Sequence, residues 1–271
     1  MRALVILALG LVLGALPAPA AARRRPAARR LTIVLDPGHG GSQRGAPGVV
    51  HGVWEKDLTL AIARKTASRL RAELGVNALL TRDGDDHLFL GRRIAFANAH
   101  GADLFVSIHL NSMPTRRERA RTEGVETYFL SANPSDPRAA RVAAFENADD
   151  PPKRGTVGGD LSLILDDLTL TAAKQGASRL AKDVQRALVA QLHAVDHGVQ
   201  QAPFVVLEGA QMPAILCEVG FVSHPEEGHK LTLPAYQDQV AAALVAGIAR
   251  YLRETAAPTA PMVQAGGASS R

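Results

Sequence analysis

Cysteine is almost absent from the sequence. Cys217 is the single cysteine among 271 residues, so an intramolecular disulfide is excluded. No cysteine stands near the end of the apolar N-terminal run, so a lipoprotein anchor is not indicated. A thiol hydrolase is also disfavoured, because Cys217 lies inside an apolar segment and not at a helix start that would stabilise a thiolate. We expect Cys217 to be a small buried side chain.

Long apolar runs are missing after the N-terminus. Arg2 precedes the apolar residues 3–16, and alanine-rich positions suited to cleavage follow, so residues 1–22 are expected to be a secretory signal. The alternative is a membrane anchor, but the run is too short to span a bilayer comfortably. We therefore expect an exported protein without a stable membrane span.

Acidic residues are missing from the first 30 positions, which contain six arginines. The formal net charge of +5 therefore comes from this segment, since residues 31–271 have 25 basic and 26 acidic residues. A nearly neutral folded part does not support a nucleic-acid-binding surface. Residues 23–30 are expected to be an Arg/Pro-rich linker, and residues 255–271 a disordered tail rich in Pro, Ala, Gly and Ser.

Residues 31–254 alternate between apolar runs and helical periodicity, which predicts one α/β domain. The predicted strands are 31–36, 76–81, 103–109, 124–130, 203–207 and 214–219. The predicted helices are 56–74, 88–100, 137–147, 174–193 and 235–253. Buried strands separated by helices indicate a mostly parallel or mixed sheet covered on both faces. We expect the protein to be a monomer. Ligands bind such sheets beyond the carboxyl ends of the strands.

Three polar side chains stand at the predicted strand ends and helix starts. His39 follows the first strand between glycines, Glu55 begins the first helix, and His109 ends a buried strand. Each has a simpler interpretation: an acid in a first helical turn favours the helix dipole, and a lone histidine is usually structural. Together, two histidines and one glutamate suit a zinc ion and leave its fourth position open for water.

Glu218 is an acid near the carboxyl end of the apolar strand 214–219. An isolated charge in such a strand is costly unless it is paired or associated with a metal. One interpretation is a structural salt bridge. The other is a general base that takes a proton from a metal-activated water.

Over residues 31–253 the chain resembles the zinc-dependent N-acetylmuramoyl-L-alanine amidases, on motifs in the family's order: Pro37-Gly38-His39-Gly40-Gly41, Glu55-Lys56, Ser107-Ile108-His109-Leu110-Asn111-Ser112, Gly124-Val125-Glu126-Thr127-Tyr128 and Glu218-Val219-Gly220-Phe221-Val222-Ser223. Thr81-Arg82, Arg93, Ala97-Asn98 and Ala102-Asp103 also match the pattern. His224 and Gln200 depart from it, standing where the family often has Asn and Lys.

The resemblance implies a twisted sheet of about six strands between helices, in a catalytic domain over residues 31–254. It implies one Zn²⁺ held by His39, Glu55 and His109, with Glu218 as the catalytic residue. The reaction would be hydrolysis, by metal-activated water, of the amide bond between N-acetylmuramic acid and L-alanine in peptidoglycan. The place would be the periplasm or cell-wall space of a bacterium. The alternatives are a zinc peptidase acting on stem-peptide bonds and a catalytically silent wall-binding or regulatory protein.

Residues 145–175 are similar to a short form of the insert in division-associated amidases. There, an inserted helix blocks the zinc until an activator protein displaces it. The resemblance therefore suggests that this chain has a regulatory insert and an activator protein that displaces it. The alternative is an ordinary surface helix with a solvated acidic face.

Overall fold

A computed structural model describes residues 29–149 and 167–256 of the chain. Several segments predicted above lie wholly or largely outside the described residues: the signal at 1–22, the linker at 23–30, the middle of the insert at 145–175 and the tail at 255–271. Among the described residues, no helix combines the length and the apolar character needed to cross a membrane.

The described residues form a six-stranded mixed sheet in the order β2-β1-β3-β6-β4-β5. All neighbouring strands run parallel except β4 and β6, which are antiparallel. The strands are β1 (Thr32–Pro37), β2 (Asn77–Leu80), β3 (Leu104–Asn111), β4 (Val125–Leu130), β5 (Asp196–Ala202) and β6 (Ala214–Phe221). The prediction of a single α/β domain with a mixed sheet of about six strands is therefore confirmed.

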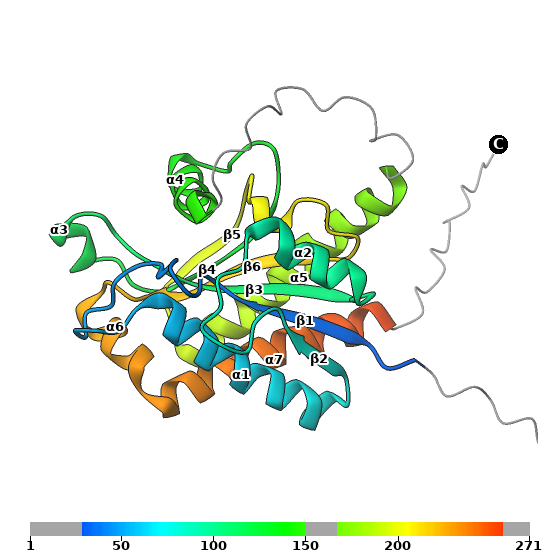
Figure 1. Ribbon diagram of the computed structural model, residues 1–271, viewed down its shortest axis with the longest axis horizontal. Coiled ribbons are helices and arrows are strands. Elements are labelled where there is room, and N and C mark those ends of the chain that lie inside the picture. Colours follow the sequence, from blue (N-terminus) through cyan, green and yellow to red (C-terminus); the bar gives the residue numbers. More distant parts are fainter. Residues whose placement is uncertain (1–28, 150–166, 257–271) are drawn as a thin grey trace, which may run out of the picture.

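Helices cover both faces of this sheet (Figure 1). They are α1 (Glu55–Leu74), α2 (Leu90–Ala99), α3 (Arg116–Arg119), α4 (Pro137–Glu146), α5 (Asp167–Leu192), α6 (Pro225–Thr232) and α7 (Pro234–Ala256). Two short 3₁₀ segments, η1 (Asn147–Asp149) and η2 (Val205–Leu207), complete the described elements. The predicted helices recur with shifted ends, since their apolar stripes pack on the sheet as the periodicity indicates.

The two sheet faces differ in chemistry because side chains alternate along each strand. One face carries Val106, Ile108 and Cys217 into a large apolar core, which α1, α5 and α7 cover. Burial raises the pKa of the Cys217 thiol, so this residue is a buried apolar group and not a nucleophile. The other face carries a smaller apolar core near α2 and, toward the carboxyl ends of β3 and β6, the polar side chains His109 and Glu218.

The predicted strand at 203–207 is wrong. Pro203 has no N–H to donate to a sheet, and Val205–Leu207 forms the 3₁₀ segment η2. The Asn147 side chain donates to the Pro203 carbonyl (2.8 Å) and accepts from the Val205 N–H (2.9 Å), so these groups are not available for strand pairing. The apolar side chains that suggested a strand, Phe204 among them, instead fill the smaller core under α2.

The sixth strand is β5, whose sequence Asp-His-Gly-Val-Gln-Gln-Ala lacks a strand-like apolar pattern. It lies at the edge of the sheet, and only Ala202 in it is buried, so little apolar character is required there. The short helices α3 and α6 were also not predicted.

His224, which departs from the family pattern, is the N-cap residue of α6, and its Nδ1 accepts a hydrogen bond from the Glu227 N–H (3.2 Å). The substitution therefore keeps a capping side chain at this position.

Close packing of α5 on α7 depends on Gly247. A Cβ atom at this position would lie 2.5 Å from the Cα of Val184, inside the backbone of α5. We expect Gly247→Ala to lower the free energy of unfolding by about 1–3 kcal/mol, because the two helices would have to separate. Urea unfolding measures this change. Gly91→Ala in α2 is the matched control: its Cβ would meet nothing within 4 Å, so stability should stay the same or rise by up to about 1 kcal/mol. Equal stability of both variants and the parent would contradict this account of the helix contact.

Candidate metal centre

His39 lies in the loop that follows β1 and has a left-handed backbone, with φ at 59°. This conformation costs a non-glycine residue on the order of 1–3 kcal/mol, so the surroundings must hold it in place. The preceding residue has to be glycine, because a Cβ on Gly38 would lie 2.6 Å from Nε2 of His109. The two buried imidazoles are thereby brought together, with ring centroids 5.0 Å apart.

Glu55 is the first residue of α1, but its side chain turns inward and is fully buried. Its Oε1 accepts a hydrogen bond from the Leu110 N–H and its Oε2 from the Ala46 N–H, each at 2.9 Å. The simpler interpretation of Glu55 as a helix-start acid is therefore insufficient. Asp57 serves that purpose instead, accepting from the Trp54 N–H at 3.2 Å.

The Glu55 carboxylate bridges the two histidines. Its Oε1 lies 3.1 Å from Nε2 of His39 and 3.2 Å from Nδ1 of His109. His109 comes from β3, on the same strand face as Ser107, as the alternation predicts. The structure thus brings together the three side chains that the sequence singled out.

A fourth ligand-type side chain, Glu146, enters the cluster from the last residue of α4. Its Oε2 lies 2.7 Å from Nδ1 of His109 and 3.3 Å from Nε2 of His39. One donor atom from each of the four buried side chains lies within 4.8 Å of the others. The sequence placed Glu146 in the candidate insert but gave no sign that it points at the histidines.

These four side chains fit a divalent cation. Two carboxylates and two imidazoles meet in a buried site, where uncompensated negative charge is costly. Nδ1 of His109 and Oε2 of Glu146 are buried and close, yet neither has a hydrogen-bond partner of good geometry among the described residues. Such convergence without hydrogen bonds is typical of metal ligands, and the donor set of nitrogen and carboxylate oxygen suits zinc.

The pKa shifts indicate the same need for positive charge. Burial acts to lower the pKa of His109, but the Glu146 and Glu55 carboxylates outweigh it and raise this pKa well above its usual value. Burial acts to raise the pKa of Glu55, but the His39 and His109 imidazoles, 3.1 and 3.2 Å from its Oε1, lower it. A proton on the imidazoles and a metal cation are therefore alternative ways to balance the carboxylates.

Glu218 lies in β6 directly across from His109 in β3. Its side chain is fully buried, and neither carboxylate oxygen has a hydrogen-bond partner among the described residues. Burial, reinforced by the nearby Glu146 carboxylate, raises the pKa of Glu218 well above its usual value. A structural salt bridge is therefore not what holds this acid, and the carboxyl can take up a proton.

A second buried acid extends this row across the sheet. Glu126 in β4 lies across from Glu218, so the register places His109, Glu218 and Glu126 side by side on three strands. Glu126 Oε1 accepts from the Asn111 side chain (2.5 Å), and its Oε2 pairs with Arg138 of α4 (2.6 Å). Only its place in the Gly124–Tyr128 motif drew attention to Glu126 in the sequence, and Arg138 was missed entirely.

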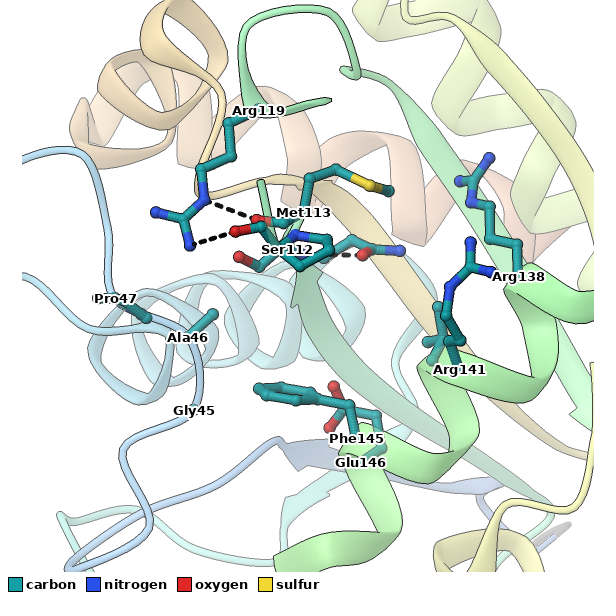
Figure 2. Close-up of a pocket in the computed structure, with 13 residues that line it drawn as sticks. Gly45, Ala46, Pro47, Ser112, Met113, Arg119, Arg138, Arg141, Phe145 and Glu146 are labelled. Carbon is teal, nitrogen blue, oxygen red and sulfur yellow. Dashed lines mark hydrogen bonds between the residues drawn. The ribbon is translucent and has the colours of Figure 1, made fainter. Parts of the chain in front are cut away.

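A cavity of about 360 Å³ adjoins the cluster, with Glu146 among the residues in its wall. Figure 2 shows α4 forming one side, with Arg138, Arg141 and Phe145 along it, while Ala46 and Arg119 lie on the other side. Much of the wall is apolar, and arginines contribute at both ends. Of the four cluster residues, only Glu146 of α4 lines this cavity.

The family model for N-acetylmuramoyl-L-alanine amidases matches residues 33–250 of this chain. The chain belongs to this family. N-acetylmuramoyl-L-alanine amidases are hydrolases, and the match includes all the side chains of the cluster and Glu218.

Individual amidases support this membership. The chain is 36% identical over 231 residues to the N-acetylmuramoyl-L-alanine amidase AmiC of Neisseria meningitidis serogroup B, covering 83% of this chain but only about half (53%) of that relative. The crystal structure of an N-acetylmuramoyl-L-alanine amidase from Clostridium difficile 630 superimposes with a TM-score of 0.64 at 30% identity, over 83% of this chain and 97% of that one. The CwlD amidase from Clostridioides difficile, solved in complex with the GerS lipoprotein, gives a TM-score of 0.62 at 26% identity, over 83% of this chain and all of that one.

A metal-binding measurement tests the assembled cluster. We expect the purified amidase domain to bind one equivalent of Zn²⁺, and His109→Ala to weaken the affinity by more than about 100-fold, because a direct ligand matters more than its supporting residues. Competition with a chromophoric chelator measures the affinity. His100→Ala, at an exposed histidine outside the cluster, should leave it unchanged. Equal affinity of the two variants would show that the cluster is not the metal site.

Proposed function

We propose that this chain hydrolyses the amide bond between N-acetylmuramic acid and L-alanine in peptidoglycan, using one zinc ion. The observation that carries the proposal is the buried cluster of His39, Glu55 and His109, directly beside an unpaired carboxyl group, in a member of the amidase family. The assignment of ligands and of Glu218 as the catalytic residue is part of the proposal.

The three proposed ligands would hold the metal through Nε2 of His39, Nδ1 of His109 and the Glu55 carboxylate. A bound zinc ion supplies Lewis-acid polarisation of the scissile carbonyl and a lowered pKa for a water molecule. The backbone amides of Ala46 and Leu110 fix the Glu55 carboxylate, so this ligand is oriented before any metal binds.

Glu218 would move the proton that the reaction has to transfer. It takes a proton from the attacking water, whose oxygen forms the new bond to the carbonyl carbon. It then gives that proton to the nitrogen of L-alanine as the C–N bond breaks, leaving a carboxylic acid on the lactyl group and a free amine on the peptide.

We propose that the described conformation is a closed, inactive form of the metal site, because Glu146 occupies it. With Glu146 beside both histidines, four protein side chains would hold the proposed metal, and Glu146 would take the position that a water molecule needs. We therefore interpret α4 as a blocking helix; only its last two residues, Phe145 and Glu146, belong to the segment 145–175 that resembles a regulatory insert. The interpretation as a plain surface helix does not explain a buried glutamate against two histidines.

A protein partner is the natural means of removing Glu146 from the site. The solved complex of the CwlD amidase with the GerS lipoprotein supports the idea that amidases of this fold associate with a second protein. We propose an activator that binds the open form of this chain. Export to the periplasm or cell-wall space is also part of the proposal, since peptidoglycan lies there and the first 22 residues fit a secretory signal.

Product analysis on purified sacculi tests the reaction. The blocked form releases little, so the digestion should use Glu146→Ala protein loaded with Zn²⁺. We expect intact stem peptides with a free N-terminal L-alanine. Release of D-alanine or of internal peptide fragments would instead identify a zinc peptidase. No release from a fully zinc-loaded, folded variant would favour a silent wall-binding protein.

Removal of the blocking carboxylate should raise basal activity. We expect Glu146→Ala to hydrolyse peptidoglycan at least about tenfold faster than the parent, the change expected when about one molecule in ten is open at rest. Dye release from labelled sacculi measures the rate. Glu73→Ala, which removes an exposed glutamate on α1, is the control and should not change the rate. A rate for Glu146→Ala equal to the parent's would show that regulation lies elsewhere.

The proposed proton carrier is tested in the open background. Glu146→Ala/Glu218→Gln should have a kcat lower by about 10²–10⁴-fold than Glu146→Ala alone, because an amide cannot accept the proton. Zinc content should stay at one equivalent, which separates loss of proton transfer from loss of the metal. A kcat within a few-fold of the background, with zinc retained, would refute the assignment of Glu218.

A further inference from the structure

Two arginines with fully buried side chains lie beneath the loop that carries His39. Arg93 comes from α2 and is 1% exposed, and Arg82 follows β2 and is 3% exposed. Burying a guanidinium is costly unless its N–H groups are all used. The destination of these hydrogen bonds therefore indicates what the two arginines do.

Arg93 binds the main chain of the His39 residue itself. Its Nη2 donates to the His39 carbonyl (2.7 Å), and its Nη1 donates to the Pro37 carbonyl (2.8 Å) and to Oδ1 of Asp36 (2.9 Å). Its Nε donates to the Leu88 carbonyl (3.1 Å), at the segment leading into α2. One planar guanidinium thus connects the end of β1, the His39 loop and α2.

Asp36 holds the guanidinium of Arg93 in this orientation. The carboxylate is fully buried and also accepts from the Thr81 hydroxyl (2.5 Å) and the Ser107 hydroxyl (2.7 Å). Burial acts to raise its pKa, but the Arg93 charge and the hydrogen bonds from Thr81, Ser107 and Arg93 together outweigh this effect and lower the pKa, so Asp36 stays ionised. The pair is thereby tied to β1 by Asp36 itself, to β3 by Ser107 and to the residue after β2 by Thr81.

Arg82 completes the support from the other side. It donates to the carbonyls of Pro37 (3.1 Å) and Gly38 (2.9 Å), and also to the carbonyl of Lys56 (2.9 Å) in the first turn of α1. Three successive main-chain carbonyls, from residue 37 to residue 39, therefore accept hydrogen bonds from buried arginines. Within the described ranges, His39 is the only non-glycine residue of the candidate site with a positive φ.

We infer that Arg93, oriented by Asp36, is a positioning residue for the metal centre, and this inference rests on the proposed function. Its hydrogen bond to the His39 carbonyl keeps this residue in the left-handed conformation. In that conformation Nε2 of His39 faces the Glu55 carboxylate. Without the bond, the backbone relaxes toward ordinary φ values and the imidazole turns away from the other ligands.

The experiment measures Zn²⁺ affinity by competition with a chromophoric chelator, in the full chain. Arg93→Lys keeps the positive charge next to Asp36 but cannot reach all the carbonyls in a fixed plane. We expect a loss of affinity of about 10–100-fold. Arg71→Lys is the matched control: Arg71 also donates to a main-chain carbonyl, that of Ala78, but supports no residue of the cluster, so affinity should not change.

A double-mutant cycle separates positioning from general damage. In a chain that already carries His39→Ala, Arg93→Lys should cause no further loss of affinity, because the residue it positions is gone. In a chain with His109→Ala, the same change should still weaken binding. Equal losses in both backgrounds, or unchanged affinity in the parent, would overturn the inference.

A milder variant decides the question if Arg93→Lys does not fold. Thr81→Val removes only a hydroxyl that orients Asp36, and we expect a loss of roughly threefold or more in Zn²⁺ affinity. Unchanged affinity for this folded variant would then overturn the inference. Because the readout is metal binding, the result is independent of the reaction: Glu146→Ala protein that binds zinc but releases no stem peptides refutes the proposed function alone.

Discussion

Two buried carboxylates and two buried imidazoles within 4.8 Å are the constraint on which the rest of this domain depends. The four groups cannot be packed together without positive charge, either from protons on the histidines or from a metal ion. Their positions require β1, β3 and α1 to end or begin at one edge of the sheet. The parallel order of β1, β3 and β6 supplies that edge, and it also brings Glu218 beside His109.

Strand alternation allows one sheet to hold both a stable core and this costly polar cluster. Val106 and Ile108 point to the core covered by α1, α5 and α7, while Ser107 and His109 point to the opposite face. On that face several polar groups are paired: the Ser107 hydroxyl and the Arg93 guanidinium both donate to the Asp36 carboxylate. The charged side chains thus support one another where apolar packing gives way to the site.

The same alternation explains what could be predicted from the sequence. The periodicity of β3 predicted the direction of His109, and the glycines around His39 indicated a sharply turning loop. Contacts between residues distant in sequence could not be predicted in this way. Glu146 reaches the histidines only because α4 folds over the edge of the sheet, and nothing in its local sequence encodes that docking. The error at 203–207 has a similar cause, because the Asn147 side chain, distant in sequence, takes up the main-chain groups of Pro203 and Val205. The edge strand β5 could not be predicted from the sequence, because a strand with little buried surface needs no apolar pattern.

In the proposed closed state, α4 can leave without disturbing the ligands that remain. Its buried face consists mainly of small side chains, Ala139, Val142 and Ala143, whose burial contributes only a few kcal/mol, roughly. Arg138 anchors it to the sheet through the Glu126 carboxylate of β4 and the His197 ring of β5. A partner that shifts such a helix from about one molecule in ten open to about nine in ten open has to bind the open form roughly 80-fold more tightly, or by about 2.6 kcal/mol, which protein interfaces readily supply.

The three proposed metal ligands owe their positions to other parts of the fold. Glu55 is fixed by the amides of Ala46 and Leu110, and His39 by Arg93, and none of these lies on α4. Opening therefore changes one ligand, Glu146, and leaves the other three in place. A site built in this way can be held inactive by its fourth ligand and become active as soon as that ligand is withdrawn, with no rearrangement of the sheet.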